Sequence, residues 1–506
     1  MLQKIDISLN SITMYRLVLY ILLALASISF LLSFLDKIPY DPLPLLFSLL
    51  LILTISFITN HIISRILKIP TNIESFIISA LILFFLLPPP INSEHAIFIG
   101  ASAFIAMTSK YLMAIKKKHI FNPAAFSILL IGYLGLYGPS WWAGDADIIP
   151  FVAVGGLLIV RKIRRFQMFF AFLAVALCVQ LIFATSQGSD ILNTIILALT
   201  SSPLLFFATI MLTEPLTTPP TRRLQIMYAT IIGILYSFQA SIGPIYSSPE
   251  FALVAGNIFS YIVSPKGKYF LILKDKIEEG KGIFSYIFTA DKIPDFHPGQ
   301  YIEWTAPLNI FNSDSRGNRR YFTIASSPTE DNLRLGVKFS EKGSKFKKFL
   351  EEMKKGEKLL AGQLAGDFTL PKSKNSKMVW VAGGIGVTPF RSMTKFLLDT
   401  TQKRDIVFFY AASNPEEFAF EDVFDQAVKK IGMKKINIVT HKQKGKNWKG
   451  LTGHITPDLI KNEVPDYVDR QYFLSGPNGM VHAYKDMLKK LGIKNTQIHT
   501  DYFPGF

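Results

Sequence analysis

The stretch that says most about the fold of this 506-residue chain is Val379-Trp380-Val381-Ala382-Gly383-Gly384-Ile385-Gly386-Val387-Thr388-Pro389. Its apolar start predicts a buried strand, its glycines let a ligand approach the backbone, and Pro389 is typical of the first turn of a helix. Such a helix start favours a bound pyrophosphate. The stretch lacks the GxGxxG fingerprint, so by itself it is equally compatible with a plain strand-to-helix connection. With the strand and helix patterns that follow it, it predicts an open α/β domain over residues 376–506.

A second strand-to-helix turn lies near the end of the chain, where residues 472–480 read Tyr-Phe-Leu-Ser-Gly-Pro-Asn-Gly-Met. Apolar residues precede Ser475, and Gly476 and Pro477 then end the strand before the next helix. Taken alone, this turn is also typical of an ordinary connection in an α/β domain.

Residues 268–372 have a different pattern, in which short runs alternate apolar and polar residues and end at glycine turns. This pattern predicts an antiparallel β-barrel. One of its strands contains Arg320-Tyr321-Phe322-Thr323, which presents a guanidinium, aromatic rings and a hydroxyl. These groups suit a diphosphate, a ring face and a ring nitrogen, although the same residues could also form an ordinary strand.

Charge is distributed very unevenly along the chain. Of its 91 charged residues (54 basic plus 37 acidic), residues 1–264 hold 25 and residues 265–506 hold 66. A single soluble globule needs ionic groups over its whole surface. The division therefore predicts a multi-domain protein, with a membrane domain over residues 1–264 fused to the two soluble domains, and the lipid bilayer is an expected partner.

Composition also excludes several kinds of chemistry. Cys178 is the only cysteine, which rules out disulfide frameworks, thiolate zinc sites and iron–sulfur clusters held by this chain. We assign no metal-binding residues, and any redox chemistry has to use an organic cofactor or haem. The net charge of +17 comes without a basic stripe interleaved with aromatic residues, so nucleic acid is not expected as a partner.

The membrane domain contains apolar runs long enough to cross about 30 Å of hydrocarbon. We identify ten, which predict an all-α polytopic domain of about ten transmembrane helices: 12–35, 43–63, 71–90, 95–115, 120–137, 148–160, 166–185, 190–212, 224–242 and 249–264.

The loops between these runs alternate in charge. Basic residues gather in every second loop: Arg65 and Lys68; Lys110 and Lys116 to Lys118; Arg161, Lys162, Arg164 and Arg165; Arg222 and Arg223; Lys266 and Lys268. The intervening loops hold Lys37 as their only basic residue. The positive-inside rule then predicts a multi-pass protein of the inner (cytoplasmic) membrane, with both termini and the soluble domains in the cytoplasm.

Two of the basic loops contain an unusual order of polar residues and prolines. One reads Phe121-Asn122-Pro123-Ala124, and the other is the hydroxyl-rich and proline-rich stretch of residues 213–223. Backbone N–H groups and hydroxyls at helix ends can hold a polar ligand inside a membrane protein. The alternative is that the prolines only start helices and the arginines only fix orientation. The candidate ligand-binding residues in these loops are Asn122, Thr213, Glu214 and Thr217.

These two loops, together with Leu81–Pro90, resemble the RnfD/NqrB membrane family over most of residues 60–264. The resemblance implies a ten-helix flavin-carrying component of an ion-translocating electron-transfer complex. Members of that family attach FMN through a phosphoester to a threonine, in a Ser-Gly-Ala-Thr-like motif of a long external segment. The corresponding stretch here, Gly138–Asp147, is short and lacks the motif. We therefore expect a dissociable ligand instead, either non-covalent FMN, riboflavin or a quinone.

The three motifs of the soluble domains, in this order and spacing, resemble the ferredoxin–NADP reductase family across residues 268–506. The resemblance implies that FAD and NADH or NADPH bind there. It implies that Arg320 binds the FAD diphosphate, that Phe322 packs on the flavin and that Thr323 hydrogen-bonds flavin N5. The other cofactor-binding residues it implies are Tyr321, Lys338, Gly343 and Ser344 for FAD, and Gly383, Gly384, Gly386, Thr388, Pro389, Gly476, Pro477 and Met480 for the nicotinamide nucleotide.

The same resemblance implies three catalytic residues. Thr323 acts at flavin N5, and Ser475 occupies a position where the family commonly has cysteine, beside the nicotinamide. Phe503, in the segment Asp501-Tyr502-Phe503, covers the flavin ring, with Phe506 as a second candidate.

The preferred nucleotide is predicted from Tyr410–Glu417, where the strand after the glycine loop ends. A 2′-phosphate is best held by arginine, and this loop has none. Glu416 and Glu417 would repel the phosphate, so NADH is favoured unless Lys442 or Lys444 folds toward the loop.

Together these observations favour an oxidoreductase that passes electrons from cytoplasmic NADH through FAD to a flavin or quinone in the membrane, or to a flavin-carrying acceptor protein. Two alternatives stay open. In one, haems replace the membrane acceptor, as in ferric reductases and NADPH oxidases; two stacked bis-His haems need four histidines, and residues 1–264 contain His61, His95 and His119 alone. In the other, the membrane half is an anchor or transporter, and the reductase serves a soluble acceptor.

Overall fold

The computed structural model describes most of the chain, namely residues 5–6, 8–9, 12–67, 73–115, 118–238, 241–242, 245–264, 268–307, 318–339, 343–440, 448 and 450–501. Phe503, Phe506, Lys442 and Lys444 lie outside the described residues. The chain divides into two compact units, Met1–Gly267 and Lys268–Pro504, which we call the helical unit and the sheet unit.

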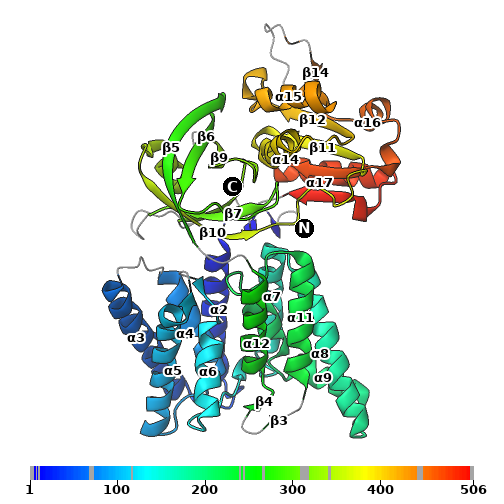
Figure 1. Cartoon of the computed structure of the whole chain (residues 1–506). Coiled ribbons are helices and arrows are strands. Elements are labelled where there is room, and N and C mark those ends of the chain that lie inside the picture. Colours follow the sequence, from blue (N-terminus) through cyan, green and yellow to red (C-terminus); the bar gives the residue numbers. More distant parts are fainter. Residues whose placement is uncertain are drawn as a thin grey trace. The chain divides into compact units, whose positions relative to one another are not determined.

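The apolar runs of the N-terminal half form the helices of the helical unit. The helices are α2 (Met14–Phe34), α3 (Pro42–Ile66), α4 (Ile73–Leu86), α5 (Ser93–Leu112), α6 (Pro123–Tyr133), α7 (Ile149–Ile163), α8 (Phe166–Ser186), α9 (Ile191–Thr200), α10 (Leu204–Phe206), the π-helix η2 (Phe207–Met211), α11 (Arg222–Ser237) and α12 (Pro249–Val263). Most of them lie roughly side by side (Figure 1), with α11 packed against α8 and α12, and α3 packed against α4 and α5. Short connections contain η1 (Trp142–Gly144) and two hairpins, β1 (Ala114–Ile115) with β2 (Lys118–His119) and β3 (Ser241–Ile242) with β4 (Ile245–Tyr246).

Only some of these helices meet the requirements of a membrane span. Among the described helices, α2, α3 and α8 are long and apolar enough, and a fourth span results if α9 and Leu204–Met211, bent by 58° at their junction, count as one. Length and composition therefore do not support the expected number of about ten spans. Several apolar runs included loop residues such as Pro88–Pro90, so the helices in those runs are shorter than the runs, whereas α3 and α8 are slightly longer than theirs. The 11-residue helix α6, for example, is only about 17 Å long at 1.5 Å per residue.

The first half of the sheet unit is an antiparallel sheet that curls into a barrel. Its strands are β5 (Tyr269–Gly280), β6 (Ile283–Ala290), β7 (Tyr301–Thr305), β8 (Arg319–Thr323), β9 (Leu333–Lys338) and β10 (Lys358–Ala365), in the order β8-β7-β10-β5-β6-β9. A bridge between Ile324 and Leu335 joins the two outer strands of that order. Trp304, Tyr286 and Phe288 are fully buried in its core. One helix, α13 (Lys345–Glu352), lies between β9 and β10 in the sequence. We call this half the barrel lobe.

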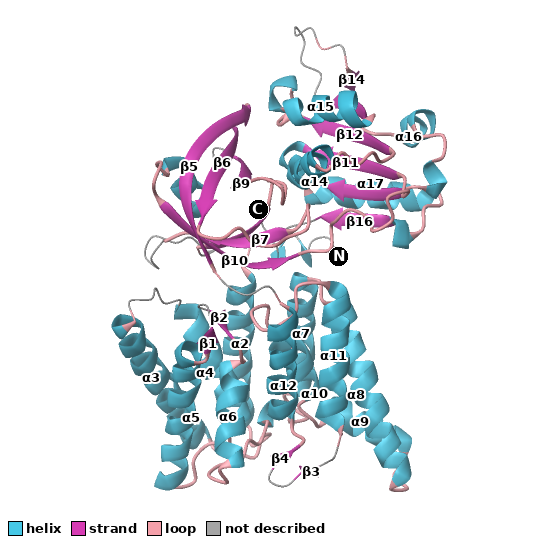
Figure 2. Cartoon of the chain, viewed as in Figure 1, coloured by secondary structure: helices cyan, strands magenta, loops and turns pink. Residues whose placement is uncertain are grey.

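The second half of the sheet unit, which we call the α/β lobe, has a parallel sheet with helices (Figure 2). Its strands are β11 (Met378–Gly383), β12 (Ile406–Ala412), β13 (Lys434–Val439), β14 (Leu451–Thr452), β15 (Gln471–Ser475) and β16 (Ile498–Asp501). Its helices are α14 (Thr388–Asp399), α15 (Glu421–Ile431), α16 (Pro457–Glu463) and α17 (Asn478–Lys490), with the short turns η4 (Gly384–Val387), η5 (Pro415–Glu417), η6 (Tyr467–Asp469) and η7 (Asn495–Gln497). The β11 and β12 strands are buried along their whole length, as expected for parallel strands covered on both faces.

The strand order locates the ligand crevice of this parallel sheet. The order is β14-β13-β12-β11-β15-β16, so the chain moves outward from β11 in one direction and later returns to its other side with β15. Ligands of such sheets bind where the strand order reverses, at the carboxyl ends of the strands. That point is the end of β11 and β15, where both predicted glycine turns begin.

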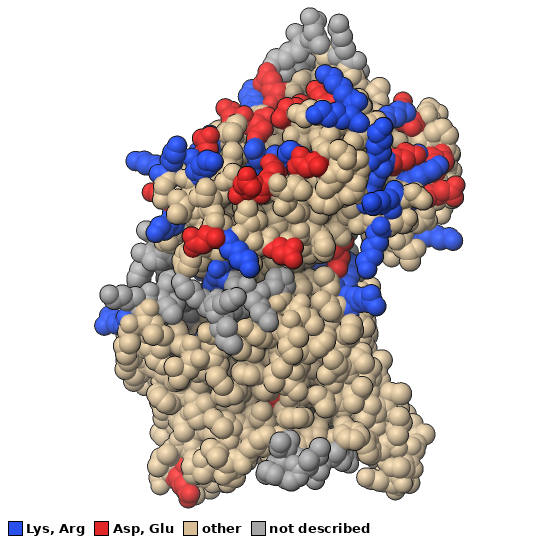
Figure 3. Space-filling model, viewed as in Figure 1, with Lys and Arg blue, Asp and Glu red and all other residues tan. Residues whose placement is uncertain are grey.

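The predicted succession of an antiparallel barrel and an open α/β domain is confirmed. The uneven charge of the sequence is visible on the surface (Figure 3), where charged side chains crowd the sheet unit and are sparse on the visible face of the helical unit.

Candidate active site

The predicted flavin motif forms strand β8, next to β7 in the barrel. Arg320 is buried, and its guanidinium lies 5.4 Å from the centre of the Phe346 ring. The Phe322 ring is 5.9 Å from the same ring, because residues two apart on a strand share a face. Tyr321 points the other way, and its hydroxyl donates to Gln363 Oε1 at 3.0 Å. The motif therefore presents Arg320 and Phe322 together and Tyr321 apart from them.

Gly343 and Ser344, which were also predicted to bind FAD, precede a helix that contacts Arg320. Ser344 is buried and caps α13, since its Oγ accepts a hydrogen bond from the Lys347 backbone N–H at 3.3 Å. Phe346, which contacts both Arg320 and Phe322, belongs to the first turn of this helix. The structure thus joins a buried cation to a capped helix start, although Arg320 and Ser344 are 24 positions apart in the sequence. Gly343 directly precedes the cap.

Lys338 has a different partner from the one the sequence suggested. Its Nζ forms an ion pair with Glu417 Oε2 at 2.8 Å, and Glu417 also accepts from Asn414 Nδ2 at 3.2 Å. Burial alone would raise the pKa of the Glu417 carboxyl, but the hydrogen bond and charge of Lys338 outweigh burial and hold that pKa below its usual value. Lys338 therefore joins the barrel lobe to the nucleotide loop that follows β12.

The two predicted glycine turns touch each other through their backbones. A Cβ on Gly386 would lie 2.5 Å from the Cα of Gly476, so this position requires glycine. A Cβ on Gly383 would lie 2.3 Å from Met480 Sδ, so the Met480 side chain would have to move. Gly384 has φ +52° with no atom within 4 Å of an added Cβ, which leaves its surroundings open. Pro477 directly precedes α17.

The helix after the first glycine turn begins as predicted. α14 starts at Thr388, whose Oγ1 donates to the carbonyl of Ile385 at 3.2 Å, and Pro389 lies in its first turn. Thr388 also packs against the barrel, where a Cβ on Gly336 would lie 2.6 Å from Thr388 Cγ2. The start of α14 therefore lies against strand β9.

A buried carboxylate links strand β8 to the start of the second glycine turn. Thr323 Oγ1 donates to Asp501 Oδ2 at 3.3 Å, and both residues are buried. Asp501 is the register partner of Ser475, which is also buried. The structure thus brings together Thr323 and Ser475, the two predicted catalytic residues among those it describes. Sequence reasoning had given Asp501 no chemical role. The feature that could have pointed to it is an acidic residue at the end of the last strand.

The helical unit brings the two specific loops together. Asn122 caps α6, its Nδ2 donates to Glu214 Oε2 at 2.9 Å, and Thr217 Oγ1 donates to the same oxygen at 3.3 Å. Asn122 and Thr217 are buried. Thr213 is buried as well, but its hydroxyl donates to the carbonyl of Thr209, within its own helical segment.

Two further residues, Asn257 and Tyr228, belong to this group, and sequence reasoning missed them. Asn257 Oδ1 accepts from the Asn122 backbone N–H at 2.7 Å, and its Nδ2 donates to Tyr228 OH at 3.2 Å. Arg165 Nη1 donates to the carbonyl of Thr213 at 3.0 Å. A lone asparagine inside the apolar run 249–264 was the signal for Asn257. We call Asn122, Glu214, Thr217, Tyr228 and Asn257 the polar cluster.

Comparison with known proteins identifies both halves. Residues 135–265 match the NQR2, RnfD, RnfE family, and residues 380–486 match the oxidoreductase NAD-binding domain. The chain is 29% identical over 232 residues to the glycine betaine monooxygenase reductase subunit of Chromohalobacter salexigens, covering 45% of this chain and 62% of that one. It is 28% identical over 243 residues to flavohemoprotein A of Dictyostelium discoideum, covering 46% and 59%. It thus spans about three-fifths of the length of these curated relatives.

A solved structure gives a weaker match. The Amycolatopsis cytochrome P450 reductase GcoB is 20% identical, with a TM-score of 0.42 over 47% of this chain and 70% of that one, too low to add to the argument.

The fold and the family matches define the sheet unit as a reductase module of the ferredoxin reductase class, with the fold that binds FAD and a nicotinamide nucleotide. The chain joins this module to a membrane domain that is similar to the NQR2, RnfD, RnfE family over residues 135–265. Both predicted resemblances are confirmed. The Phe121–Ala124 loop and Leu81–Pro90 lie outside the segment that matches the family.

Proposed function

We propose that the chain is a membrane-bound oxidoreductase that takes a hydride from NADH onto FAD and passes the electrons to a ligand of the helical unit. The observation that carries the proposal is the meeting of Thr323, Asp501 and Ser475 beside the touching glycine turns. A flavin on β8 and a nicotinamide on those turns would lie next to each other there. Bound FAD would supply the chemistry, accepting two electrons as hydride and releasing them singly.

The residues present fit FAD chemically. Arg320 supplies a buried cation, and the capped start of α13 supplies backbone N–H groups, both suited to a diphosphate. Phe322 supplies an aromatic face in the same strand.

Thr323 supports the proposed hydride transfer through its partner. When Asp501 is ionised it can only accept, so the Thr323 hydroxyl proton is committed to it and the Thr323 oxygen keeps free lone pairs. Those lone pairs suit an N–H group such as the one at flavin N5 after hydride transfer. Thr323 would thus stabilise the reduced flavin relative to the oxidised flavin.

The loop after β12 supports NADH over NADPH. Glu417 is paired with Lys338 and Glu416 with Lys281 at 3.0 Å, so the acidic side chains are held in the loop by the barrel. A 2′-phosphate would have to break these pairs. We expect kcat/KM to be at least about tenfold higher for NADH, which corresponds to about 1.4 kcal/mol.

The polar cluster supports a polar ligand in the helical unit. Its members carry amide, carboxylate, hydroxyl and phenol groups, which are costly to bury inside apolar helices without a function. The π-helix η2 directly precedes the loop that supplies Glu214, and π-helical turns are frequent at functional sites. We propose that a dissociable flavin or a quinone binds at this cluster.

We also propose the orientation that charge predicts, with the basic loops in the cytoplasm. Helix α8 tests it, because it is a candidate span with Arg164 before its start and Gln187 after its end. In a Cys178→Ser background, a cysteine at Gln187 should react with an impermeant maleimide from outside intact cells, and one at Arg164 only after permeabilisation. The opposite pattern would refute the orientation.

The decisive experiment uses the purified full-length protein. We expect an FAD spectrum without a Soret band, rapid bleaching by NADH under anaerobic conditions, no fluorescent band in a denaturing gel, and NADH–quinone turnover in liposomes. A Soret band would favour the haem alternative, and a fluorescent band would show covalent flavin. If NADH bleaches the FAD but no electrons reach a quinone or a second flavin, the remaining hypothesis is a reductase that is anchored to the membrane and serves a soluble acceptor.

A further inference from the structure

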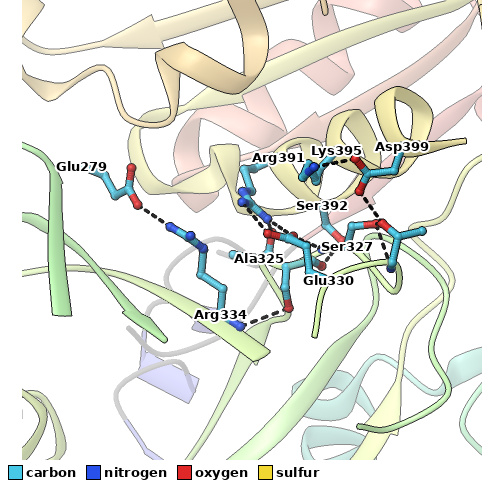
Figure 4. A network of polar contacts seen from close by, with 11 residues as sticks. Glu279, Ala325, Ser327, Glu330, Arg334, Arg391, Ser392, Lys395 and Asp399 are labelled. Atoms are coloured by element: carbon cyan, nitrogen blue, oxygen red, sulfur yellow. Dashed lines mark hydrogen bonds and ion pairs between the residues drawn. The ribbon is translucent and has the colours of Figure 1, made fainter. Parts of the chain in front are cut away.

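The two lobes of the sheet unit are joined by an ion pair between a buried arginine and a partly exposed glutamate, and no cofactor role explains this pair. Arg391 lies in the first turn of α14 and is 3% exposed. Its guanidinium makes a two-pronged contact with the carboxylate of Glu330, with Nη2 donating to Oε1 at 2.9 Å and Nη1 donating to Oε2 (Figure 4). Nη1 also donates to the carbonyl of Ala325 at 3.1 Å. The contact crosses from the α/β lobe to the barrel lobe.

Neighbouring contacts hold both partners in one geometry. Glu330 Oε2 accepts the backbone N–H of Ser327 at 2.6 Å, which fixes the carboxylate on its own turn. One residue after Arg391, Ser392 Oγ donates to the carbonyl of Ser326 at 2.6 Å. Farther along α14, Asp399 Oδ2 accepts from Thr329 Oγ1 at 2.5 Å. One face of α14 is thus bound to the segment 325–330 at several points.

The positions of these contacts in the sequence are informative. The segment 325–330 begins two residues after Thr323, and Arg391 follows Thr388 by three residues. The ion pair therefore connects the end of the flavin strand to the start of the helix that the glycine turn leads into. Glu330 lies in the turn that follows this strand, and Arg391 lies in the first turn of α14, so the ion pair restrains the two segments next to the place where flavin and nicotinamide would meet.

Stability alone is a poor explanation for this pair. A buried ion pair gains little over apolar side chains, because desolvation offsets the attraction between the charges. An arginine in the first turn of a helix also lies at the positive end of the helix dipole. The two-pronged geometry, in contrast, restrains both distance and orientation.

We propose that Arg391 and Glu330 are positioning residues for hydride transfer, setting the distance between the flavin strand and the nicotinamide turn. The inference rests on the proposed function. Reaction rates are sensitive to such distances, and a misplacement of about 1 Å can cost about 100-fold. The pair affects the rate of hydride transfer. It does not affect the binding of FAD or NADH, because each cofactor is bound by residues of its own lobe.

The test compares variants of the Arg391–Glu330 pair with a variant of a similar ion pair that lies inside one lobe. The first group, which we call the clamp variants, consists of Glu330→Gln and Arg391→Lys. Arg391→Lys keeps the charge but loses the two-pronged geometry. The control is Asp405→Asn, because Asp405 makes a similar contact with the buried Arg470, at 2.7 and 3.0 Å, within the α/β lobe. For each full-length protein, stopped-flow absorbance gives the FAD reduction rate at saturating NADH and the apparent Kd for NADH, and thermal unfolding gives Tm.

We expect the limiting reduction rate to fall about 10- to 100-fold in both clamp variants, with FAD content and the apparent Kd for NADH changed less than about threefold. The long-wavelength charge-transfer absorbance between NAD⁺ and reduced FAD should weaken as well. Asp405→Asn should lower Tm comparably and keep the rate within about twofold. If Glu330→Gln yields no folded protein, Arg391→Lys decides.

If NADH reduces the FAD of the clamp variants as fast as the FAD of the wild type, this inference is overturned and the proposed function stays intact. An equal loss of rate in Asp405→Asn would overturn it too, since the effect would then follow stability. A wild-type protein whose FAD is not reduced by NADH would overturn both.

Discussion

The hydroxyl of Thr323 donates a hydrogen bond to the buried carboxylate of Asp501 over 3.3 Å, across 178 positions of sequence. The contact ties strand β8 of the barrel lobe to the last strand of the α/β lobe, directly opposite Ser475. In the proposed function, the action of Thr323 therefore depends on a residue of the other lobe.

Thr323→Val should retain FAD but slow its reduction by NADH about 10- to 100-fold, because one hydrogen bond of about 1.5 to 3 kcal/mol is lost in the transition state. Stopped-flow reduction of the purified protein measures the rate. Thr323→Ser keeps the hydroxyl and should stay near the wild-type rate. If NADH reduces the FAD of Thr323→Val at the wild-type rate, Thr323 takes no part in hydride transfer.

Arg320→Ala should lose FAD itself, because a buried guanidinium for the diphosphate is removed. We expect the Kd for FAD to rise about 10- to 100-fold, equivalent to about 1.4 to 2.7 kcal/mol, measured by fluorescence of flavin released on dilution. Arg319→Ala is the matched control, since Arg319 is paired with Glu303 at 3.5 Å. Full FAD occupancy in Arg320→Ala would show that the diphosphate binds elsewhere.

Gly386→Ala should impair use of NADH, because its Cβ would lie 2.5 Å from Gly476 Cα and would push the two glycine turns apart. The KM for NADH should rise at least about tenfold, with FAD content unchanged. Gly479→Ala provides the comparison, as an added Cβ there meets no atom within 4 Å. Equal KM values in the two variants would argue against a nucleotide at these turns.

The acid stability of the sheet unit should depend in part on Asp466. The hydrogen bond from Arg470 Nε, 2.6 Å long, holds the pKa of Asp466 at about 2, below its value of about 3.9 in an unfolded chain. Because the folded value is the lower one, ionised Asp466 stabilises the fold above about pH 4, and this contribution is lost as the pH falls through about 2.

The Tm difference between wild type and Asp466→Asn should therefore be largest above about pH 5 and should narrow toward pH 3. Thermal unfolding followed by FAD fluorescence measures it. Asp469→Asn, at an exposed neighbouring position, serves as the comparison. A difference that does not vary with pH would contradict the assignment.

Glu214→Gln and Asn122→Ala should each lower NADH–quinone turnover at least about tenfold, because their 2.9 Å hydrogen bond holds the polar cluster together. NADH–ferricyanide activity, which needs the sheet unit alone, should stay unchanged. Gln187→Ala, at the exposed end of α8, serves as the control. Unchanged quinone turnover in both variants would exclude the polar cluster as the acceptor site.

Local pattern was sufficient for the parts of the fold that depend on neighbouring residues. The apolar run before Gly383 predicted a strand and a turn, and Pro389 predicted the start of a helix. The structure has β11 up to Gly383, η4 after it and α14 from Thr388. The apolar runs also predicted where helices lie. The lengths of several helices were overestimated, because hydropathy does not distinguish a helical residue from an apolar loop residue such as Pro88.

Partners distant in sequence could not be predicted in the same way. Lys338 was expected to bind FAD, and its ion pair with Glu417 appears only once β9 and the loop after β12 are neighbours. Asn257 looked like an isolated polar residue in an apolar run until α12 brought it to Asn122.

The sequence by itself determined the order of the domains, the membrane character of the first half and the residue types at each turn, because these follow from hydropathy, charge and backbone preferences of adjacent residues. Only the tertiary structure decided which side chains share a site. The pairs Thr323–Asp501, Asn122–Glu214 and Glu330–Arg391 are 178, 92 and 61 positions apart. Their distances are set by strand register and helix packing over the whole unit, and no local preference encodes them.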